Sequence, residues 1–372
     1  MGAETKIAWC DRTFQPWIGC QRVSPGCQHC YAEAFDKRVG GATISETSAG
    51  VTMTHKALRW GPTAPRTRTS AAYWRQPLAW DKAAAQAGVR SRVFCASLAD
   101  VFEARLELVE WRTQLLDLIA RTPHLDWLLL TKRPENVAAL LRQSLMVLEG
   151  TTAGTFTDAA IMLRLWLDGV GTDDGKPHPP ANVWLGTTVE DQKRANERIP
   201  ALLSVPARVR FLSCEPLLEP VALPMFCLCG CGKTVEAALA EPSPLNREQR
   251  EASMRTGLGI DWLIIGGESG PKARPFNVAW ARALVRQGRS AGAKVFVKQL
   301  GSNVRTRNDD NLIGDFEEGG WFLNAPQIEE NVNGYREGHQ GAEVRVRLVA
   351  RAGEDPAEWP EDLRVREFPE SK

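Results

Sequence analysis

Leu125-Asp-Trp-Leu-Leu-Leu-Thr-Lys-Arg-Pro134 is the stretch that decides the fold. Its apolar run lacks the alternation of a half-buried strand, which is typical of a strand buried on both faces of a parallel sheet. The run ends in polar residues, and a helical pattern follows Pro134, a residue type that the first turn of a helix tolerates. The stretch therefore predicts one strand-to-helix unit of a βα series.

The same order of apolar run, polar end and helical stretch recurs along the chain. The other five runs cover residues 92–100, 182–190, 209–216, 261–269 and 294–301. A first strand is expected near Ile7 to Trp9, and Asn277 is expected to cap the helix before the last run. Such a series predicts an α/β fold closed as a partial or complete parallel βα barrel of the TIM type, with a doubly wound open sheet as the alternative.

The periodic pattern also suggests how the chain is divided. We expect the barrel to cover residues 1–301, with turn-rich insertions at about 143–181 and 220–259. After Gly301 the pattern stops, so residues 302–372 are expected to form a C-terminal extension. The length of 372 residues allows one large domain or two ordinary ones.

Composition excludes several classes of protein. A net charge of +1 gives no bulk sign of a nucleic-acid or membrane binder, although a local basic groove stays compatible with it. The chain has no apolar run of about 20 residues and no signal-peptide core, so we expect no membrane partner and a cytoplasmic location. In that compartment the nine cysteines indicate metal binding or chemistry rather than disulfides.

Polar side chains end every predicted strand, and barrels build their active sites at this face. The alternative is that polar residues only mark where each strand leaves the core. Glu215 and Lys298 are expected to pair across the mouth as a general acid and base or as a substrate clamp, and with Glu268 they are the candidate catalytic residues. The candidate cofactor-binding residues are Ser97, Lys132, Arg133, Gly266, Gly267, Glu268 and Ser269.

Three cysteines near the N-terminus have the spacing C-x6-C-x2-C: Cys20, Cys27 and Cys30. A turn at Ser24-Pro-Gly26 would fold the loop between them, so that three thiolates could converge on one ion or cluster. The close pair Cys27 and Cys30 is common to zinc knuckles and iron–sulfur loops. Zinc would need a fourth ligand, for which His29, Cys10 or His55 could serve, whereas a [4Fe–4S] cluster could leave one iron open.

The other cysteines fall into two groups. Cys227, Cys229 and Cys231 are a second candidate metal site, in which Cys227 and Cys231 could form half of a zinc knuckle. Cys95 and Cys214 lie inside predicted strands and are expected to be small core residues. Cys10 has no assignment.

A basic and aromatic stretch covers residues 59–75. Arginines alternate there with aromatic residues, a pattern that could contact a nucleic-acid backbone and stack bases. The alternative is a surface loop that packs its own aromatic side chains. The residues are Arg59, Trp60, Arg66, Arg68, Tyr73, Trp74 and Arg75.

Several of these motifs together resemble a known family. They are Lys6-Ile-Ala-Trp-Cys-Asp11, Trp17-Ile-Gly-Cys20, Ser24-Pro-Gly-Cys-Gln-His-Cys-Tyr31, Leu130-Thr-Lys-Arg-Pro134, Phe211-Leu-Ser-Cys-Glu-Pro-Leu217, Ile265-Gly-Gly-Glu-Ser-Gly270 and Trp359-Pro-Glu-Asp-Leu-Arg-Val-Arg366. The set resembles a phage-associated family with a three-cysteine motif that is similar to radical SAM proteins. Two features of this chain differ from the usual radical SAM pattern. The usual cysteine spacing is C-x3-C-x2-C, whereas here it is C-x6-C-x2-C, and the usual Gly-Gly-Glu follows the second strand, whereas here it follows a late strand.

The resemblance implies a partial barrel in which Cys20, Cys27 and Cys30 hold a [4Fe–4S] cluster. S-adenosylmethionine would bind the fourth iron and yield a 5′-deoxyadenosyl radical, with electrons from a donor such as a flavodoxin or ferredoxin. The leading hypothesis is therefore a radical-SAM-like enzyme that modifies an unknown substrate, for which a nucleotide or nucleic acid is the candidate. The alternatives are a zinc-stabilised, non-catalytic nucleic-acid-binding barrel and a barrel hydrolase without a cluster.

Overall fold

The structure is a computed structural model, and it describes residues 5–39, 42–48, 51–151, 157–170, 172–224, 226–227, 256–257, 259–307, 327–331 and 343–370. The chain divides into two compact units. The first unit comprises residues 1–187, 201–210 and 370–372, and the second comprises 188–200 and 211–369. The division passes through two strands and one helix, and each unit is described by itself.

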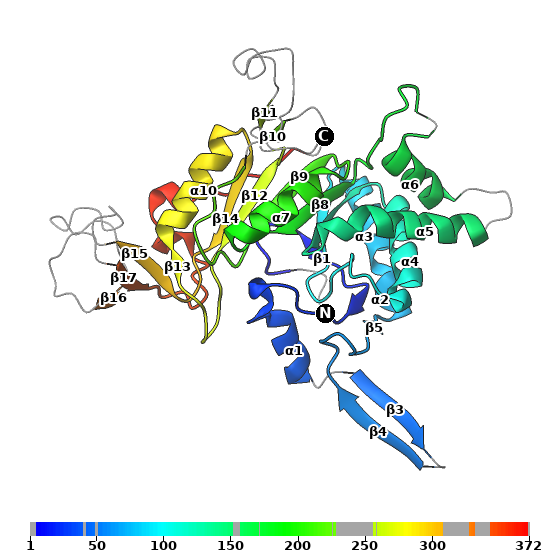
Figure 1. The fold of residues 1–372 in the computed structure, drawn as a ribbon, viewed down its shortest axis with the longest axis horizontal. Coiled ribbons are helices and arrows are strands. Elements are labelled where there is room, and N and C mark those ends of the chain that lie inside the picture. The colour runs from blue at the N-terminus through cyan, green and yellow to red at the C-terminus, as the bar shows by residue number, and fades with distance from the viewer. Residues whose placement is uncertain are drawn as a thin grey trace, which may run out of the picture. The chain divides into compact units, whose positions relative to one another are not determined.

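The first unit contains four strands of the main sheet (Figure 1). Neighbouring strands run parallel, with Phe94 opposite Leu128 and Leu129 opposite Leu185. These strands are β1 (Arg12–Thr13), β6 (Ser91–Cys95), β7 (Leu125–Thr131) and β8 (Val183–Thr188). The helices of this unit are α1 (Tyr31–Val39), α2 (Ala71–Trp74), α3 (Gln76–Ala87), α4 (Val109–Ala120), α5 (Val137–Thr151) and α6 (Asp158–Asp168).

The second unit contains three further parallel strands. They are β9 (Val209–Cys214, Val209 and Arg210 belonging to the first unit), β12 (Trp262–Gly266) and β14 (Lys294–Gln299). The helix α10 (Val278–Ser290) packs on β12 and β14. The helix α7 (Gln192–Leu203) crosses the division between the units. A separate four-stranded sheet joins β13 (Phe276–Asn277), β15 (Val304–Arg307), β17 (Glu343–Arg347) and β16 (Gln327–Asn331).

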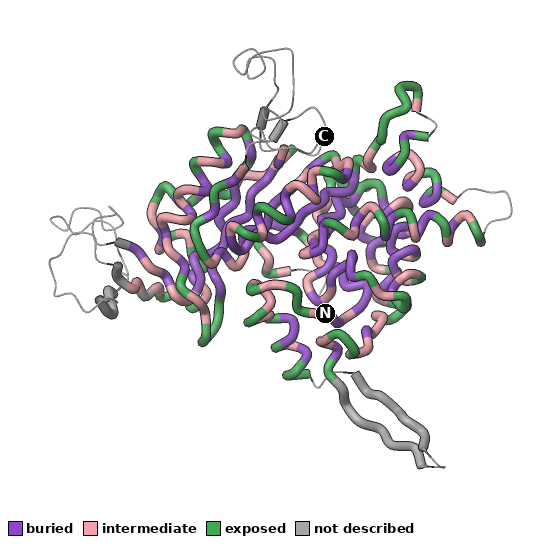
Figure 2. The backbone as a smooth tube through the Cα atoms, viewed as in Figure 1, coloured by how far each residue is buried: buried purple, intermediate pink, exposed green. Residues whose placement is uncertain are grey.

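Seven parallel strands with their helices form an α/β half-barrel, which confirms the predicted partial parallel βα barrel. All six apolar runs are strands, and β8 and β12 are buried along their whole length (Figure 2). The first strand lies at Arg12–Thr13, so its predicted position near Ile7 to Trp9 was wrong. It covers two residues and carries no apolar run of its own.

Local signals placed two helix starts correctly. Pro134 opens a short 3-10 turn, η3 (Pro134–Asn136), that leads directly into α5. The Asn277 side chain accepts a hydrogen bond from the backbone N–H of Ala279 at 2.9 Å, which satisfies one of the free donors at the start of α10.

Short elements complete the described chain. Two-stranded pairs join β2 (Trp17–Ile18) to β5 (Thr67–Arg68), β3 (Ala42–Ser48) to β4 (Val51–Ala57), and β10 (Phe226–Cys227) to β11 (Thr256–Gly257). The remaining 3-10 turns are η1 (Pro25–Cys27), η2 (Leu106–Leu108), η4 (Pro356–Glu358) and η5 (Glu361–Leu363). The predicted insertion at 143–181 contains the end of α5 and all of α6, and the boundaries predicted for the insertions and the extension stay predictions. No helix in the described part of the chain has the length and apolar character needed to span a membrane.

Candidate functional site

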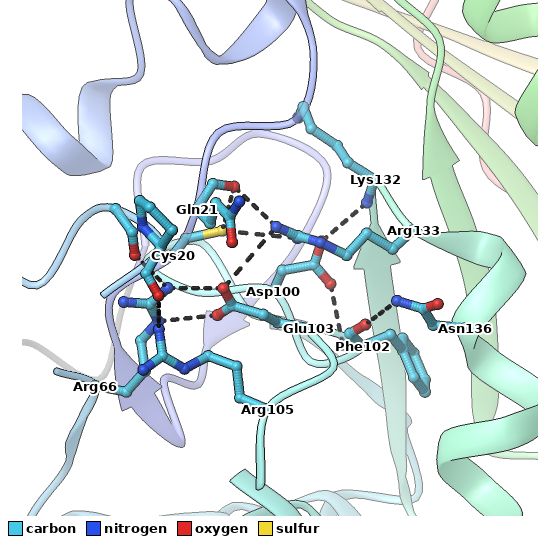
Figure 3. Close-up of polar contacts among 12 residues, drawn as sticks. Cys20, Gln21, Arg66, Asp100, Phe102, Glu103, Arg105, Lys132, Arg133 and Asn136 are labelled. Carbon is cyan, nitrogen blue, oxygen red and sulfur yellow. Dashed lines mark hydrogen bonds and ion pairs between the residues drawn. The ribbon is translucent and has the colours of Figure 1, made fainter. Parts of the chain in front are cut away.

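The loop that carries the three cysteines is tied to the carboxyl ends of β6 and β7 in the first unit. The backbone N–H of Gly19 donates to the carbonyl of Leu98 at 3.0 Å, and the Tyr31 hydroxyl donates to the carbonyl of Ser97 at 2.8 Å. The Arg133 guanidinium donates to the carbonyl of Gln21 at 2.8 Å (Figure 3). The cysteine loop and the polar ends of β6 and β7 therefore form one region of the first unit.

A glycine before the first cysteine makes this approach possible. Gly19 has a φ of +120°, and a Cβ atom there would lie 2.4 Å from the carbonyl oxygen of Arg59. A side chain at this position would push the loop away from the segment that begins at Arg59, so the close packing beside Cys20 requires glycine.

The three thiols differ in their surroundings. The Sγ atom of Cys20 accepts from Arg133 Nη1 at 3.8 Å, and burial, reinforced by the charge of Asp100, raises the pKa of Cys20 to about 12. Cys27 ends the 3-10 turn formed by the predicted Ser24-Pro-Gly26 segment, with its Sγ 3.8 Å from the Ser24 hydroxyl. Cys30 lies directly before α1 and is half-buried.

The donor set suits an iron–sulfur cluster in kind, since cysteine thiolates are the usual ligands of such clusters. Among the described residues, no three His, Cys, Asp or Glu side chains already gather as a metal-binding group. A cluster on Cys20, Cys27 and Cys30 would therefore draw the three thiols together and displace their protons as it forms. Of the second cysteine group, Cys229 and Cys231 lie outside the described residues and the side chain of Cys227 is not described, so that zinc site stays a prediction.

Asp100, at the end of the segment after β6, organises this region. Its carboxylate accepts from the Thr131 hydroxyl at 2.7 Å and from Arg133 Nη1 at 2.7 Å. It also accepts from the backbone N–H groups of Phe102 and Lys132, at 3.0 and 3.1 Å. Asp100 is 5% exposed, and four donors satisfy it, so it fixes the ends of β6 and β7 relative to each other.

Glu103 is a second buried carboxylate, and it was not among the predicted site residues. Arg66 binds it in a bidentate pair, with Nε–Oε2 and Nη2–Oε1 distances of 2.9 and 2.7 Å (Figure 3). The Arg112 guanidinium, fully buried, donates to the carbonyls of Val101 and Glu103, and burial lowers the pKa of Arg112 to about 10. The position of Glu103 three residues after Asp100 was the only sequence signal for it.

Arg133 lies inside this cluster rather than on a solvated rim. It is 7% exposed and is paired with Asp100, and Glu103 Oε1 lies 4.0 Å from its Nη2. Burial by itself would lower the pKa of Arg133, but the charges of Asp100, Cys20 and Glu103 raise it. Arg133 is therefore a fixed cation beside Cys20. Ser97 lies nearby, with its hydroxyl accepting from Gln15 Nε2 at 2.7 Å.

In the second unit, Glu215 and Lys298 form the predicted ion pair, between Oε1 and Nζ. Glu215 directly follows β9, and Lys298 belongs to β14. These two strands flank β12. A Cβ atom on Gly266 would lie 3.2 Å from Cγ of Glu215, so the glycine leaves room for the glutamate side chain. The two side chains are 19% and 23% exposed and accessible to solvent.

The other predicted residues of this unit have internal partners or face solvent. Glu268 accepts three hydrogen bonds from Arg274, including Nη2–Oε1 at 2.7 Å. A Cβ atom on Gly267 would lie 2.2 Å from the carbonyl oxygen of Leu300, so the close approach that this glycine permits is to the protein's own backbone. Ser269 is exposed.

The basic and aromatic stretch packs largely inside the first unit. Arg59 and Arg66 are 8% and 6% exposed and pair with Asp36 and Glu103, respectively. The Tyr73 ring stacks on Phe14, with a centroid distance of 5.2 Å. Of the four arginines, Arg59 and Arg66 are thus engaged in ion pairs and not available to a phosphate backbone. Cys95 and Cys214 are buried in β6 and β9, as predicted.

Comparison with known proteins identifies the family. Residues 4–354 match the family described as "Protein of unknown function (DUF5131)". The chain belongs to this family. No curated protein matches the sequence. Among solved structures, the fold is similar to "Spore photoproduct lyase complexed with dinucleoside spore photoproduct", with a TM-score of 0.35 and 9% identity, covering 93% of this chain and 71% of that chain.

Proposed function

We propose that the protein is an iron–sulfur enzyme of the radical SAM type, with Cys20, Cys27 and Cys30 as the three protein ligands of a [4Fe–4S] cluster. The observation that carries this proposal is the attachment of the cysteine loop to the carboxyl ends of β6 and β7. Active sites of βα barrels are built at this face. Three thiols on one loop, beside that face of a half-barrel, are the arrangement such chemistry needs.

The bound cofactors would supply the radical chemistry, since a cluster with S-adenosylmethionine generates a 5′-deoxyadenosyl radical. The chain's own part is to hold the loop and keep it oriented. Arg133 does this by donating to Gln21 and Cys20, while Asp100 holds Arg133 in place. Lys132 and Ser97, at the ends of the same strands, are proposed to contact the cofactor or substrate.

Glu215 and Lys298 are proposed to handle protons or clamp a substrate in the second unit. Their ion pair is solvent-accessible, and it places an ammonium proton on Nζ against a carboxylate oxygen. Glu268, held by Arg274, is proposed as a positioning group. Gly266, Gly267 and Ser269 belong to the same backbone segment and are proposed as parts of this site. An external electron donor such as a flavodoxin or ferredoxin is part of the proposal. The substrate is proposed to be a nucleotide or nucleic acid.

Anaerobic reconstitution with iron and sulfide tests the cluster. We expect about four irons per chain, and Cys20→Ala, Cys27→Ala and Cys30→Ala should each lose most of them. The matched control is Cys214→Ala, because Cys214 is buried in β9 and belongs to the other unit. Equal iron in all four variants would refute the assignment. One zinc per chain without iron would favour the zinc-stabilised alternative instead.

Cleavage of S-adenosylmethionine tests the reaction separately. A reduced, loaded enzyme should form 5′-deoxyadenosine, and the three cysteine variants should not. A loaded enzyme that forms none under reducing conditions would leave an iron–sulfur protein without radical SAM activity, which contradicts the proposed function.

A further inference from the structure

A cavity of about 530 Å³ lies in the first unit, among α2, α3, α4 and α5. Its volume is in the range of pockets that hold small organic ligands. Cys20, Asp100, Glu103 and Arg133 do not line it, so it is distinct from the cysteine-loop region.

The lining is positively charged. It contains three arginines, Arg68, Arg75 and Arg121, against a single carboxylate, Asp117. Arg121 Nη1 lies 3.3 Å from Asp117 Oδ2, but both side chains are more than a third exposed, so water weakens this pair and a stronger anion could replace it. Arg75 is exposed at the edge of the cavity. The cavity therefore suits an anionic group.

Arg68 is held in position before any ligand binds. Its guanidinium lies 4.3 Å from the centroid of the Trp74 ring, and its Nη2 donates to Gln114 Oε1 at 2.8 Å. A guanidinium has five N–H donors, so these two contacts leave donors for an anion. Because the side chain is already ordered, binding would cost little of its rotamer entropy.

The same cavity has apolar walls and a buried donor. Leu78, Leu118 and Leu148 line it, and they offer nothing to an inorganic ion. Trp74 also lines it, is 8% exposed, and its indole N–H is buried without a hydrogen-bond partner among the described residues. This N–H is covered by protein atoms and is not part of the accessible lining, so the lining offers apolar walls beside the arginines. An anion that carries an apolar organic part meets both the charged and the apolar features of the cavity.

We propose that this cavity binds a nucleoside phosphate, with the phosphate against Arg68, Arg75 and Arg121 and the nucleoside against the leucine walls. A free nucleotide and the terminal nucleotide of a strand share this chemistry. The site needs no cluster, so it stands or falls independently of the proposed radical SAM function.

Equilibrium dialysis of the full chain, without iron loading, tests the site with labelled deoxyadenosine monophosphate. We expect saturable binding of one nucleotide per chain, with inorganic phosphate and deoxyadenosine each competing at least about tenfold more weakly, because each supplies half of the contacts. A 5′-phosphorylated strand of ten deoxyadenosines distinguishes the sources. Tighter binding of the strand indicates a strand end, and equal or weaker binding indicates the free nucleotide.

Variants locate the binding. Arg75→Gln, at an exposed position that does not endanger folding, and Arg68→Gln should each weaken binding about tenfold, since each removes one charge-assisted contact. Leu78→Trp should weaken it by filling the cavity without changing charge. Arg142→Gln is the matched control, because Arg142 is an exposed arginine of α5 outside the cavity lining. Absence of nucleotide binding, or equal affinity in Arg75→Gln, Leu78→Trp and Arg142→Gln, would overturn the proposal. Competition by phosphate as strong as by the nucleotide would also overturn it.

Discussion

Both units contain ion pairs between a carboxylate and a basic side chain, and two of these examples lie in contrasting surroundings. In the first unit, Arg66, Asp100, Glu103 and Arg133 form a buried network in which each carboxylate has several donors. In the second unit, Glu215 and Lys298 form a pair that is about one-fifth exposed. Burial and the number of partners therefore decide whether such a pair holds the fold together or is accessible for chemistry. The buried network should be far more sensitive to loss of a charge.

Asp100→Ala should give the largest effect. It would leave Arg133 buried without its main partner, and breaking a buried pair costs about 3–5 kcal/mol of unfolding free energy. Urea unfolding followed by circular dichroism measures this loss. Asp117→Ala, which breaks an exposed pair with Arg121, is the control and should cost about 0–1 kcal/mol. Similar losses in the two variants would remove the distinction between buried and exposed pairs.

Gly267→Ala should come next, through packing rather than charge. The added Cβ would collide with the Leu300 carbonyl, and such overpacking costs about 1–3 kcal/mol. Gly150→Ala is the control, because a Cβ there meets nothing within 4 Å and α5 should gain about 0.5–1 kcal/mol from alanine. Thermal unfolding should therefore shift in opposite directions for the two variants. A neutral Gly267→Ala would contradict the close backbone approach between Gly267 and Leu300, which directly follow β12 and β14.

Alkylation of Cys20 tests how deeply the first unit shields its thiol. A pKa near 12 instead of 9.0 keeps the thiol protonated at pH 8, so the reactive thiolate is scarce and appears only as pH rises towards 12. Because less acidic thiolates are better nucleophiles, we expect labelling about thirtyfold slower than in the unfolded chain. Mass spectrometry of iodoacetamide-treated protein at pH 8, with and without denaturant, measures the ratio. Equal rates would show that Cys20 is not shielded.

Lys298→Met should have the smallest effect on stability. The pair with Glu215 is accessible to water, so its loss should cost no more than about 1 kcal/mol. If the proposed role is correct, turnover should fall much more than stability, and Lys193→Met, an exposed lysine of α7, should change neither. A loss of several kcal/mol in Lys298→Met would place this pair with the buried network instead.

The positions of the strands were predictable from the sequence, but the burial and the partners of the charged residues were not. All six apolar runs became strands because a continuous run of Leu, Ile, Val and Trp is a local signal of burial on both faces. The strand at Arg12–Thr13 was misplaced because its position depends on pairing with β6, whose sequence lies about 80 residues away. Arg59 and Arg66 looked like a basic surface, yet their partners Asp36 and Glu103 bury them.

The sequence by itself determined the βα order, the polar residues at the strand ends and the C-x6-C-x2-C loop, because each of these depends on neighbours within a few positions. Only the tertiary structure decided which polar side chains are held by partners inside the protein and which are accessible to solvent. Arg133 is held by Asp100 and Gln21, and Glu268 by Arg274, whereas the pair of Glu215 and Lys298 stays accessible. The reason is that Coulombic and hydrogen-bond energies depend on the distance between two groups and on their burial. The sheet brings together residues such as Glu215 and Lys298, which are 83 positions apart in the chain.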